Sequence, residues 1–191
     1  MTRRLFARRV IRAGAAGLLL LLGACAVPPR LVGHGAAAFS RSGRFAVNVS
    51  DNSGEPRAVQ GGFSWLDEGG NQRLDLANPL GSTLARVDIT PAGAVLLRAD
   101  GTREFAQNAD ALVAQVVGGP IPVEGLRTWL RGRTDGRARD LKTGAGGKIE
   151  SFLENGWSVR LTNYDALGPR LLVLRRADAG TRIVVRLVID S

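Results

Sequence analysis

Cysteine and histidine are the residues of this chain best suited to nucleophilic or metal chemistry, and each occurs once, as Cys25 and His34. Cys25 follows an aliphatic residue and two small ones, in the order Leu22-Gly23-Ala24. A cysteine thiolate is a strong nucleophile that can take up a diacylglyceryl group, and small side chains before it admit a peptidase. We therefore expect cleavage before Cys25 and acylation of its sulfur.

His34 lies far from other candidate ligands, in a stretch without regular periodicity. We interpret it as a solvated linker residue rather than a metal ligand or a catalytic base. With Cys25 acylated, Ser-His and Cys-His schemes and most metal sites are excluded. Paired carboxylates, as in glycosidases, remain conceivable, but the acidic residues lie mainly in turns and on exposed strand faces. We predict that the chain is not an enzyme and needs no metal or cofactor.

The segment before Cys25 has the three parts of an export signal. Residues 1–12 carry five arginines and no acid, and residues 13–22 are apolar and end in five leucines. Ten helical residues rise about 15 Å, half of the roughly 30 Å needed to cross a bilayer. We assign residues 1–24 to a signal peptide. An ordinary secretory signal cut at Ala24 is the alternative, although it would leave a lone free thiol on an exported protein.

The motif Leu22-Gly23-Ala24-Cys25 resembles the lipobox of bacterial lipoproteins. By that resemblance the mature protein is anchored to a membrane by the acyl chains on Cys25. Two or three acyl chains anchor a protein firmly, whereas one chain alone gives only marginal membrane binding. Ala26 stands where an Asp retains many enterobacterial lipoproteins at the inner membrane. The resemblance therefore implies a lipid anchor at the periplasmic face of the outer membrane.

The charge of the mature chain is modest. Five of the 26 basic residues precede Cys25, which leaves 21 against 17 acidic ones and a net charge of +4. The remaining arginines are scattered among acids and apolar residues, without a basic stripe or interleaved aromatics. This pattern argues against nucleic acid as a partner.

Residues 25–42 show no period and include Pro28-Pro29, which is typical of a flexible tether. From residue 43 to 191 we expect one folded domain. Apolar and polar residues alternate in runs such as Phe45-Val47-Val49 and Ile183-Val185-Leu187, with turn signals between them. Period-two alternation of this kind predicts antiparallel strands.

The middle of the chain changes to helical spacing. Leu112, Val113 and Val117 fit one face of a short helix that Gly118 ends, and residues 123–130 fit a second helix. Residues 133–147 are polar and glycine-rich, and we expect a mobile loop. The fold class is therefore mainly β (α+β): an unclosed antiparallel barrel or curved sheet of about ten strands, with short helices over its open side.

Alternation does not distinguish a filled interior from an apolar cavity, and inward Val, Leu and Trp are more often core. Twelve apolar residues are candidates to line such a cavity or its helical lid: Phe45, Val47, Phe63, Trp65, Leu74, Leu76, Leu126, Trp129, Leu130, Trp157, Val185 and Leu187.

Three further motifs carry a resemblance across nearly all the mature domain. They are Asn78-Pro79-Leu80-Gly81-Ser82, the run from Pro120 through Leu126-Arg127-Thr128-Trp129-Leu130 to Gly132, and Asn155-Gly156-Trp157-Ser158-Val159. In this order, behind a lipobox, they resemble the LolB family of outer-membrane lipoprotein receptors. The resemblance implies an unclosed barrel with a helical lid over an apolar cavity.

The resemblance also implies partners. Family members take acylated lipoproteins from the periplasmic carrier LolA and release them into the inner leaflet of the outer membrane. We expect a monomer with these partners. The rival interpretation is an anchored scaffold that binds another envelope protein and carries no lipid.

Leu80 is the residue to which the resemblance gives a specific role. In the family, the loop with this motif presents an exposed leucine that helps to move cargo into the bilayer, so Pro79, Leu80 and Gly81 are the expected membrane-insertion loop. Pro, Gly and Asn favour a turn here. From physical chemistry alone, Leu80 could equally fold back onto the core.

Overall fold

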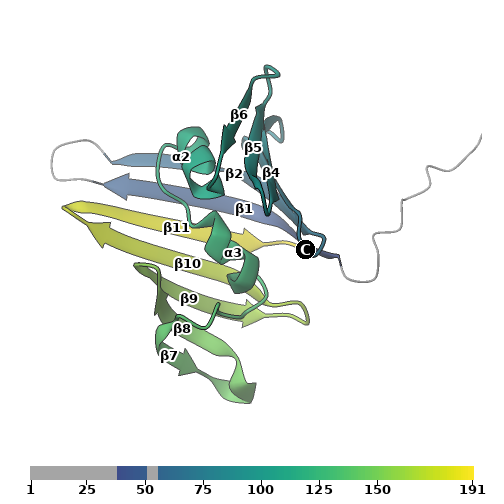
Figure 1. Cartoon of the computed structure of the whole chain (residues 1–191). Coiled ribbons are helices and arrows are strands. Elements are labelled where there is room, and N and C mark those ends of the chain that lie inside the picture. Colours follow the sequence, from purple (N-terminus) through teal and green to yellow (C-terminus); the bar gives the residue numbers. More distant parts are fainter. Residues whose placement is uncertain (1–37, 51–55) are drawn as a thin grey trace, which may run out of the picture. The chain divides into compact units, whose positions relative to one another are not determined.

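One antiparallel sheet of eleven strands forms the folded domain, and two helices lie over it (Figure 1). The computed structural model describes residues 38–50 and 56–191. Cys25 and His34 lie outside the described residues, as does the predicted signal peptide.

The first half of the sheet is a meander of six strands. They are β1 (Phe39–Ser50), β2 (Arg57–Asp67), β3 (Gln72–Ala77), β4 (Thr83–Thr90), β5 (Gly93–Arg98) and β6 (Arg103–Ala106). The helices α2 (Ala109–Val117) and α3 (Val123–Trp129) follow. The second meander contains β7 (Arg139–Thr143), a short 3-10 turn η1 (Ala145–Gly147), β8 (Ile149–Glu154), β9 (Trp157–Tyr164), β10 (Pro169–Asp178) and β11 (Thr181–Ile189).

The two meanders join where the first strand pairs with the last. β1 is bonded to β2 on one side and to β11 on the other, with Phe45 opposite Leu187 and Val47 opposite Val185. The approach is close at Gly43, where an added Cβ would lie 2.0 Å from the carbonyl oxygen of Val188. β6 and β7 end the strand order and have no second strand partner in the described part of the chain, so the sheet is unclosed, as predicted.

Local sequence explains the helix ends. The Asn108 side chain accepts the backbone N–H of Asp110 at the start of α2, which satisfies an amide that helical hydrogen bonds leave free. Gly118 ends the helix with a left-handed φ of 73°, a conformation that glycine adopts without strain. Both helices were expected from the spacing of their apolar residues.

The core lies between the helices and the inward face of the sheet. It contains Phe45, Trp65 and Leu187 from the strands, and Val113 and Trp129 from the helices. The inward residues alternate with exposed ones in nearly every strand, which confirms the period-two prediction.

Two boundaries differ from expectation. Strand β1 begins at Phe39 rather than Gly43, and the buried side chain of Arg41 lies within it. The expected loop 133–147 contains strand β7, whose five residues are all exposed. Its hydrogen bonds to β8 make it a strand without any alternation of burial, which is why periodicity did not reveal it.

Candidate functional site

The space between α2, α3 and the sheet is the candidate binding interior. It holds an apolar cavity of about 20 Å³. The cavity is lined by Phe45, Phe63, Trp65, Leu74, Leu76, Val113, Ile121, Leu126, Leu130 and Leu187. Eight of these ten are among the twelve residues singled out from the sequence.

The other four candidates are buried but do not line the cavity. Val47, Trp157 and Val185 belong to the core of the sheet, and Trp129 packs edge-on against Phe152 with ring centroids 5.8 Å apart. Val113 and Ile121, which sequence reasoning did not include, complete the lining. Val113 shares a helical face with Leu112 and Val117, so helical spacing was the signal available for it.

The interior is filled. A volume of about 20 Å³ has room for roughly one water molecule, whereas pockets for drug-sized ligands occupy roughly 300–1,000 Å³. An acyl chain could therefore enter only if the residues around the cavity move apart, as they would if α2 and α3 moved away from the sheet. The contacts that hold these helices control such a movement.

A buried carboxylate on the sheet holds one side of α3. Asp67, at the end of β2, accepts a hydrogen bond of 2.8 Å from Arg131 and forms a longer ion pair of 3.4 Å with Arg127. Burial acts to raise the pKa of Asp67, but the hydrogen bond from Arg131 and the charges of both arginines outweigh it and lower that pKa. The Arg131 guanidinium also lies 3.9 Å from the centre of the Phe39 ring.

A second buried carboxylate holds the other side of α3. The indole N–H of Trp129 donates to Glu154 Oε1 of β8 at 3.1 Å. Burial raises the pKa of Glu154, and the nearby charge of Asp135 adds to the effect. Together, Asp67 and Glu154 tie α3 to both meanders of the sheet.

Two further polar contacts support this arrangement. Asp110 of α2 accepts the backbone N–H of Glu124 in α3 at 3.1 Å, and burial raises the pKa of Asp110. Arg41 of β1 pairs with Asp165 in the β9–β10 turn at 2.8 Å, and this hydrogen bond lowers the pKa of Asp165 to about 2.

Sequence reasoning missed all of these polar residues. Arg41 shares its strand face with Phe45, Asp67 with Trp65, and Glu154 with Phe152. Their inward register was the signal that could have identified them.

The turn between β3 and β4 presents Leu80 to solvent. The Leu80 side chain is 92% exposed. Its own backbone N–H and that of Ser82 both donate to the Asn78 side-chain oxygen at 3.0 Å, and Gly81 takes a left-handed φ of 87°. These contacts define a tight turn that holds Leu80 away from the core.

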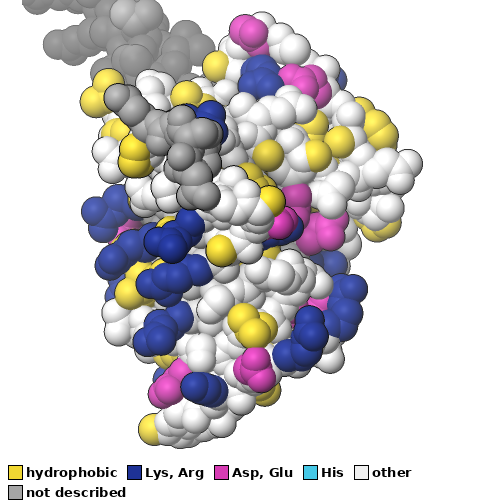
Figure 2. All heavy atoms as spheres, turned by 90° about the vertical axis from the view of Figure 1, so that its left-hand side faces the viewer, with side chains coloured by type: hydrophobic (Ala, Val, Ile, Leu, Met, Phe, Trp, Pro, Cys, Tyr) yellow, Lys and Arg dark blue, Asp and Glu magenta, His cyan; other side chains and the backbone are white. Residues whose placement is uncertain are grey.

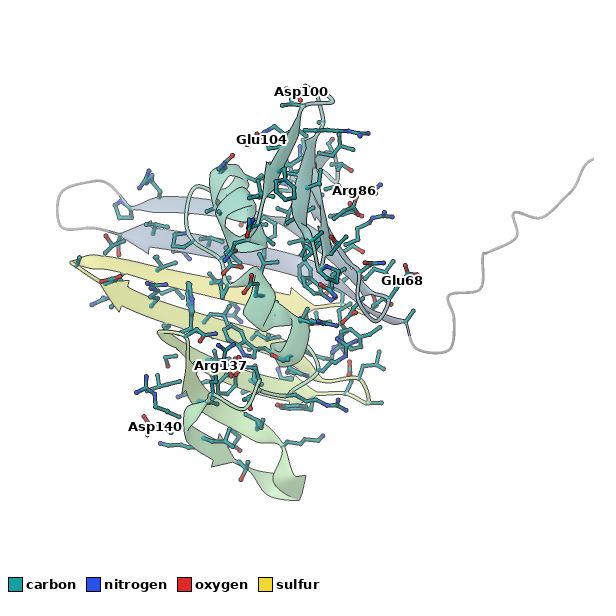
Figure 3. All side chains as sticks on the ribbon, viewed as in Figure 1. Glu68, Arg86, Asp100, Glu104, Arg137 and Asp140 are labelled. Carbon is teal, nitrogen blue, oxygen red and sulfur yellow. The ribbon has the colours of Figure 1, made fainter. Side chains whose placement is uncertain are left out.

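Acidic residues are spread over several elements of the domain. Figure 3 shows Glu68, Asp100 and Asp140 at three separate places on the domain. Within residues 38–50 and 56–191, no three His, Cys, Asp or Glu side chains are grouped as a metal site would require. The same residues include no helix with the length and hydropathy of a membrane span.

Comparison with known proteins places the chain in a family. The family model "Outer membrane lipoprotein LolB" matches residues 37–191. The chain belongs to the LolB family. The outer-membrane lipoprotein LolB of Bordetella petrii is 53% identical over 180 residues, which cover 93% of this chain and 90% of that protein. The LolB protein of Bordetella pertussis is 52% identical, across 91% of this chain and 88% of that protein. The LolB protein of Cupriavidus pinatubonensis is 38% identical, across 91% of this chain and 90% of that protein.

Among solved structures, a LolA superfamily protein from Nitrosomonas europaea is similar with a TM-score of 0.44 at 12% identity, covering 80% of this chain and 87% of that one.

Membership confirms the resemblance drawn from the sequence motifs. This LolB-family chain is an outer-membrane lipoprotein that acts in lipoprotein localisation as a receptor and not as an enzyme. Membership also implies interaction with lipoprotein cargo and with a LolA-type carrier.

Proposed function

We propose that this LolB-family protein accepts acylated lipoproteins from a LolA-type periplasmic carrier and inserts them into the inner leaflet of the outer membrane. Acylated Cys25 anchors the protein, the interior beneath α2 and α3 takes the acyl chains, and the β3–β4 turn enters the bilayer.

The observation that carries this proposal is the exposure of Leu80. The Leu80 side chain is 92% exposed, so its transfer from water into an apolar phase is favourable. The Asn78 side chain holds the backbone of the turn in place. A bilayer is the apolar phase that such a tip can enter without any rearrangement of the fold.

The interior supports the acyl-binding part of the proposal. All ten residues around the cavity are apolar, so acyl chains would find no polar anchor there. Transfer is then passive: the receptor holds the chains better than the carrier and less well than the bilayer.

The filled interior is the observation that favours the rival function, a scaffold that carries no lipid. Binding of a fluorescent fatty-acyl probe to the anchored protein separates the two. Probe displaced by acylated lipoprotein would support the receptor, and no binding of either ligand would favour the scaffold.

The test of the membrane step is Leu80→Glu. A charge on the turn opposes entry into the bilayer and touches no packed residue, so we expect normal thermal unfolding, normal cargo acceptance and blocked delivery to vesicles. Leu167→Glu is the matched control, because Leu167 is also an exposed leucine (55%) but lies in the β9–β10 turn of the second meander. Normal delivery by Leu80→Glu would refute the role of the turn.

A further inference from the structure

Exposed arginines lie on the outer face of the second meander, opposite the helices. In the strand register, Val173 of β10 lies between Arg160 of β9 and Arg186 of β11. Arg175 lies two residues along β10, on the same face as Val173. Figure 2 shows Lys and Arg side chains gathered in the left half of the view, below the grey segment.

Two neighbouring surface grooves extend this charge. One, of about 540 Å³, is lined in part by Lys142, Lys148 and Arg160. The other, of about 370 Å³, is lined in part by Arg44, Arg170 and Arg186. Asn163 lines both grooves, so they adjoin. We call these six cations, together with Arg175, the outer basic face; the acids that line its grooves are Glu150 and Asp190.

Most of this charge is uncompensated. Arg44 forms a loose, exposed ion pair of 3.4 Å with Asp190, and Arg170 donates to the backbone carbonyls of residues 189 and 190. For Lys142, Lys148, Arg160, Arg175 and Arg186, no ion pair occurs within the described parts of the chain.

Three arginines of the first meander have close acidic partners. Arg73, Arg86 and Arg98 are each paired with an acid at 2.6–2.9 Å. Five of the seven cations of the outer basic face lack such an acidic partner in the described residues, which indicates that this face is available for an anionic partner.

The outer basic face is continuous with the Leu80 turn. A third groove, of about 340 Å³, is lined by Arg44, Gln60 and Gly62 on the strands and by Pro79 and Gly81 of the turn. Arg44 therefore borders both the turn and the groove of Arg170 and Arg186. Half-buried Leu171, Val173 and Val188 lie among the cations, as suits a surface that meets lipid headgroups.

We propose that the outer basic face binds the phosphate headgroups of anionic phospholipids and orients the domain for entry of the Leu80 turn into the bilayer. This inference rests on the proposed membrane role of that turn. Juxtamembrane cations gain roughly a fivefold binding preference each from an anionic surface. The interaction is electrostatic and is weakened by salt.

The test uses the full acylated chain anchored in vesicles. With Cys25 acylated, an added Asn48→Cys provides a single thiol for a fluorescent donor on the outer face of β1, and the acceptor is a headgroup-labelled lipid. Energy transfer should be higher in phosphatidylcholine vesicles with about 30 mol % phosphatidylglycerol than in phosphatidylcholine alone. The difference should vanish near 0.5 M salt, on the order of the concentration that screens such contacts.

The deciding variant combines Arg160→Gln and Arg186→Gln. It should lower the equilibrium constant for apposition to anionic vesicles by about twenty-fivefold, at roughly fivefold per arginine. The control combines Arg103→Gln and Arg133→Gln, which removes the same charge from exposed positions outside the outer basic face and should leave apposition unchanged.

Two results would overturn the proposal. One is an equal loss in both double variants, which would indicate an effect of net charge. The other is unchanged apposition of the Arg160→Gln and Arg186→Gln double variant to anionic vesicles. If that variant also accepted cargo poorly from the carrier, the outer basic face would be a binding surface for a protein instead of lipid. Leu80→Glu should keep the phosphatidylglycerol-dependent apposition while it loses delivery, so failure of the basic face and failure of the turn give different results.

Discussion

The interior beneath α3 and the β3–β4 turn both contain apolar residues, but they hold them in opposite ways. In the interior, ten apolar side chains close around a cavity of about 20 Å³, and α3 is tied down through Asp67 and Glu154. In the turn, Leu80 stands in solvent on a backbone that is already fixed.

The difference separates the costs of the two steps. Uptake of an acyl chain requires apolar and polar contacts of α3 to break before new ones form. Entry of Leu80 into a bilayer requires no rearrangement, because only water is displaced. Substitutions that change the free energy of unfolding should therefore alter the uptake of acyl chains. Substitutions in the Leu80 turn should alter the delivery of cargo without changing that free energy.

The largest expected effect contrasts Trp129→Ala with Leu80→Ala. Trp129 is fully buried, and its truncation should lower the free energy of unfolding by about 3–5 kcal/mol. Leu80→Ala should change that free energy by less than about 0.5 kcal/mol. Urea unfolding of the two variants measures both, and a comparable loss in Leu80→Ala would show that the turn packs on the fold.

A smaller effect is expected from Asp67→Asn. The change leaves Arg131 without its counter-ion and should cost about 1–3 kcal/mol of stability. It should also speed the uptake of a fluorescent acyl probe, because α3 leaves the sheet more easily. Asp88→Asn breaks an exposed pair with Arg73 and should alter neither quantity. Unchanged uptake in a destabilised Asp67→Asn would mean that this contact supports the fold and does not hold the lid.

The smallest effect concerns the ion pair of Arg41 with Asp165. The pKa of Asp165 is lowered to about 2, from an ordinary value near 4. A carboxyl with a lowered pKa adds stability above about pH 4 and loses it as the pH falls towards 2. Because Asp165 is one-third exposed, solvent screening limits this contribution to about 1 kcal/mol.

Asp165→Asn should therefore be less stable than the parent chain at pH 7, and the difference should shrink as the pH falls below about 4 and be largely lost below about pH 2, as measured by urea unfolding across that range. A difference that stayed constant with pH would show that Asp165 acts through its hydrogen bonds to the backbone of the β9–β10 turn and not through its charge.

The sequence predicted those parts of the fold that repeat. Strands with one buried face alternate visibly, and the helices change the period, so the order of elements and most of the interior were accessible. Strand β7 could not be predicted in this way, because all of its residues are exposed. Its pairing with β8 therefore leaves no alternation of apolar and polar residues.

The polar contacts that hold α3 and the β9–β10 turn could not be predicted from the sequence for a different reason. The burial of Arg41, Asp67 and Glu154 was not predicted, because charged side chains are rarely buried unless paired. Their partners are 124, 64 and 25 residues away in sequence. The size of the cavity was equally inaccessible, since it depends on how side chains from α2 and α3 mesh with the sheet.

The pairing of β1 with β11 also governs when this domain can fold. The central ladder of the sheet joins residues 43–50 to residues 182–189, so it cannot form until the end of the chain has been synthesised. Contacts so distant in sequence form slowly, and an outer-membrane lipoprotein must cross the inner membrane before it reaches its destination. Because the β1–β11 pair needs residues 182–189, folding is delayed, and this delay favours a chain that is still unfolded when it is translocated.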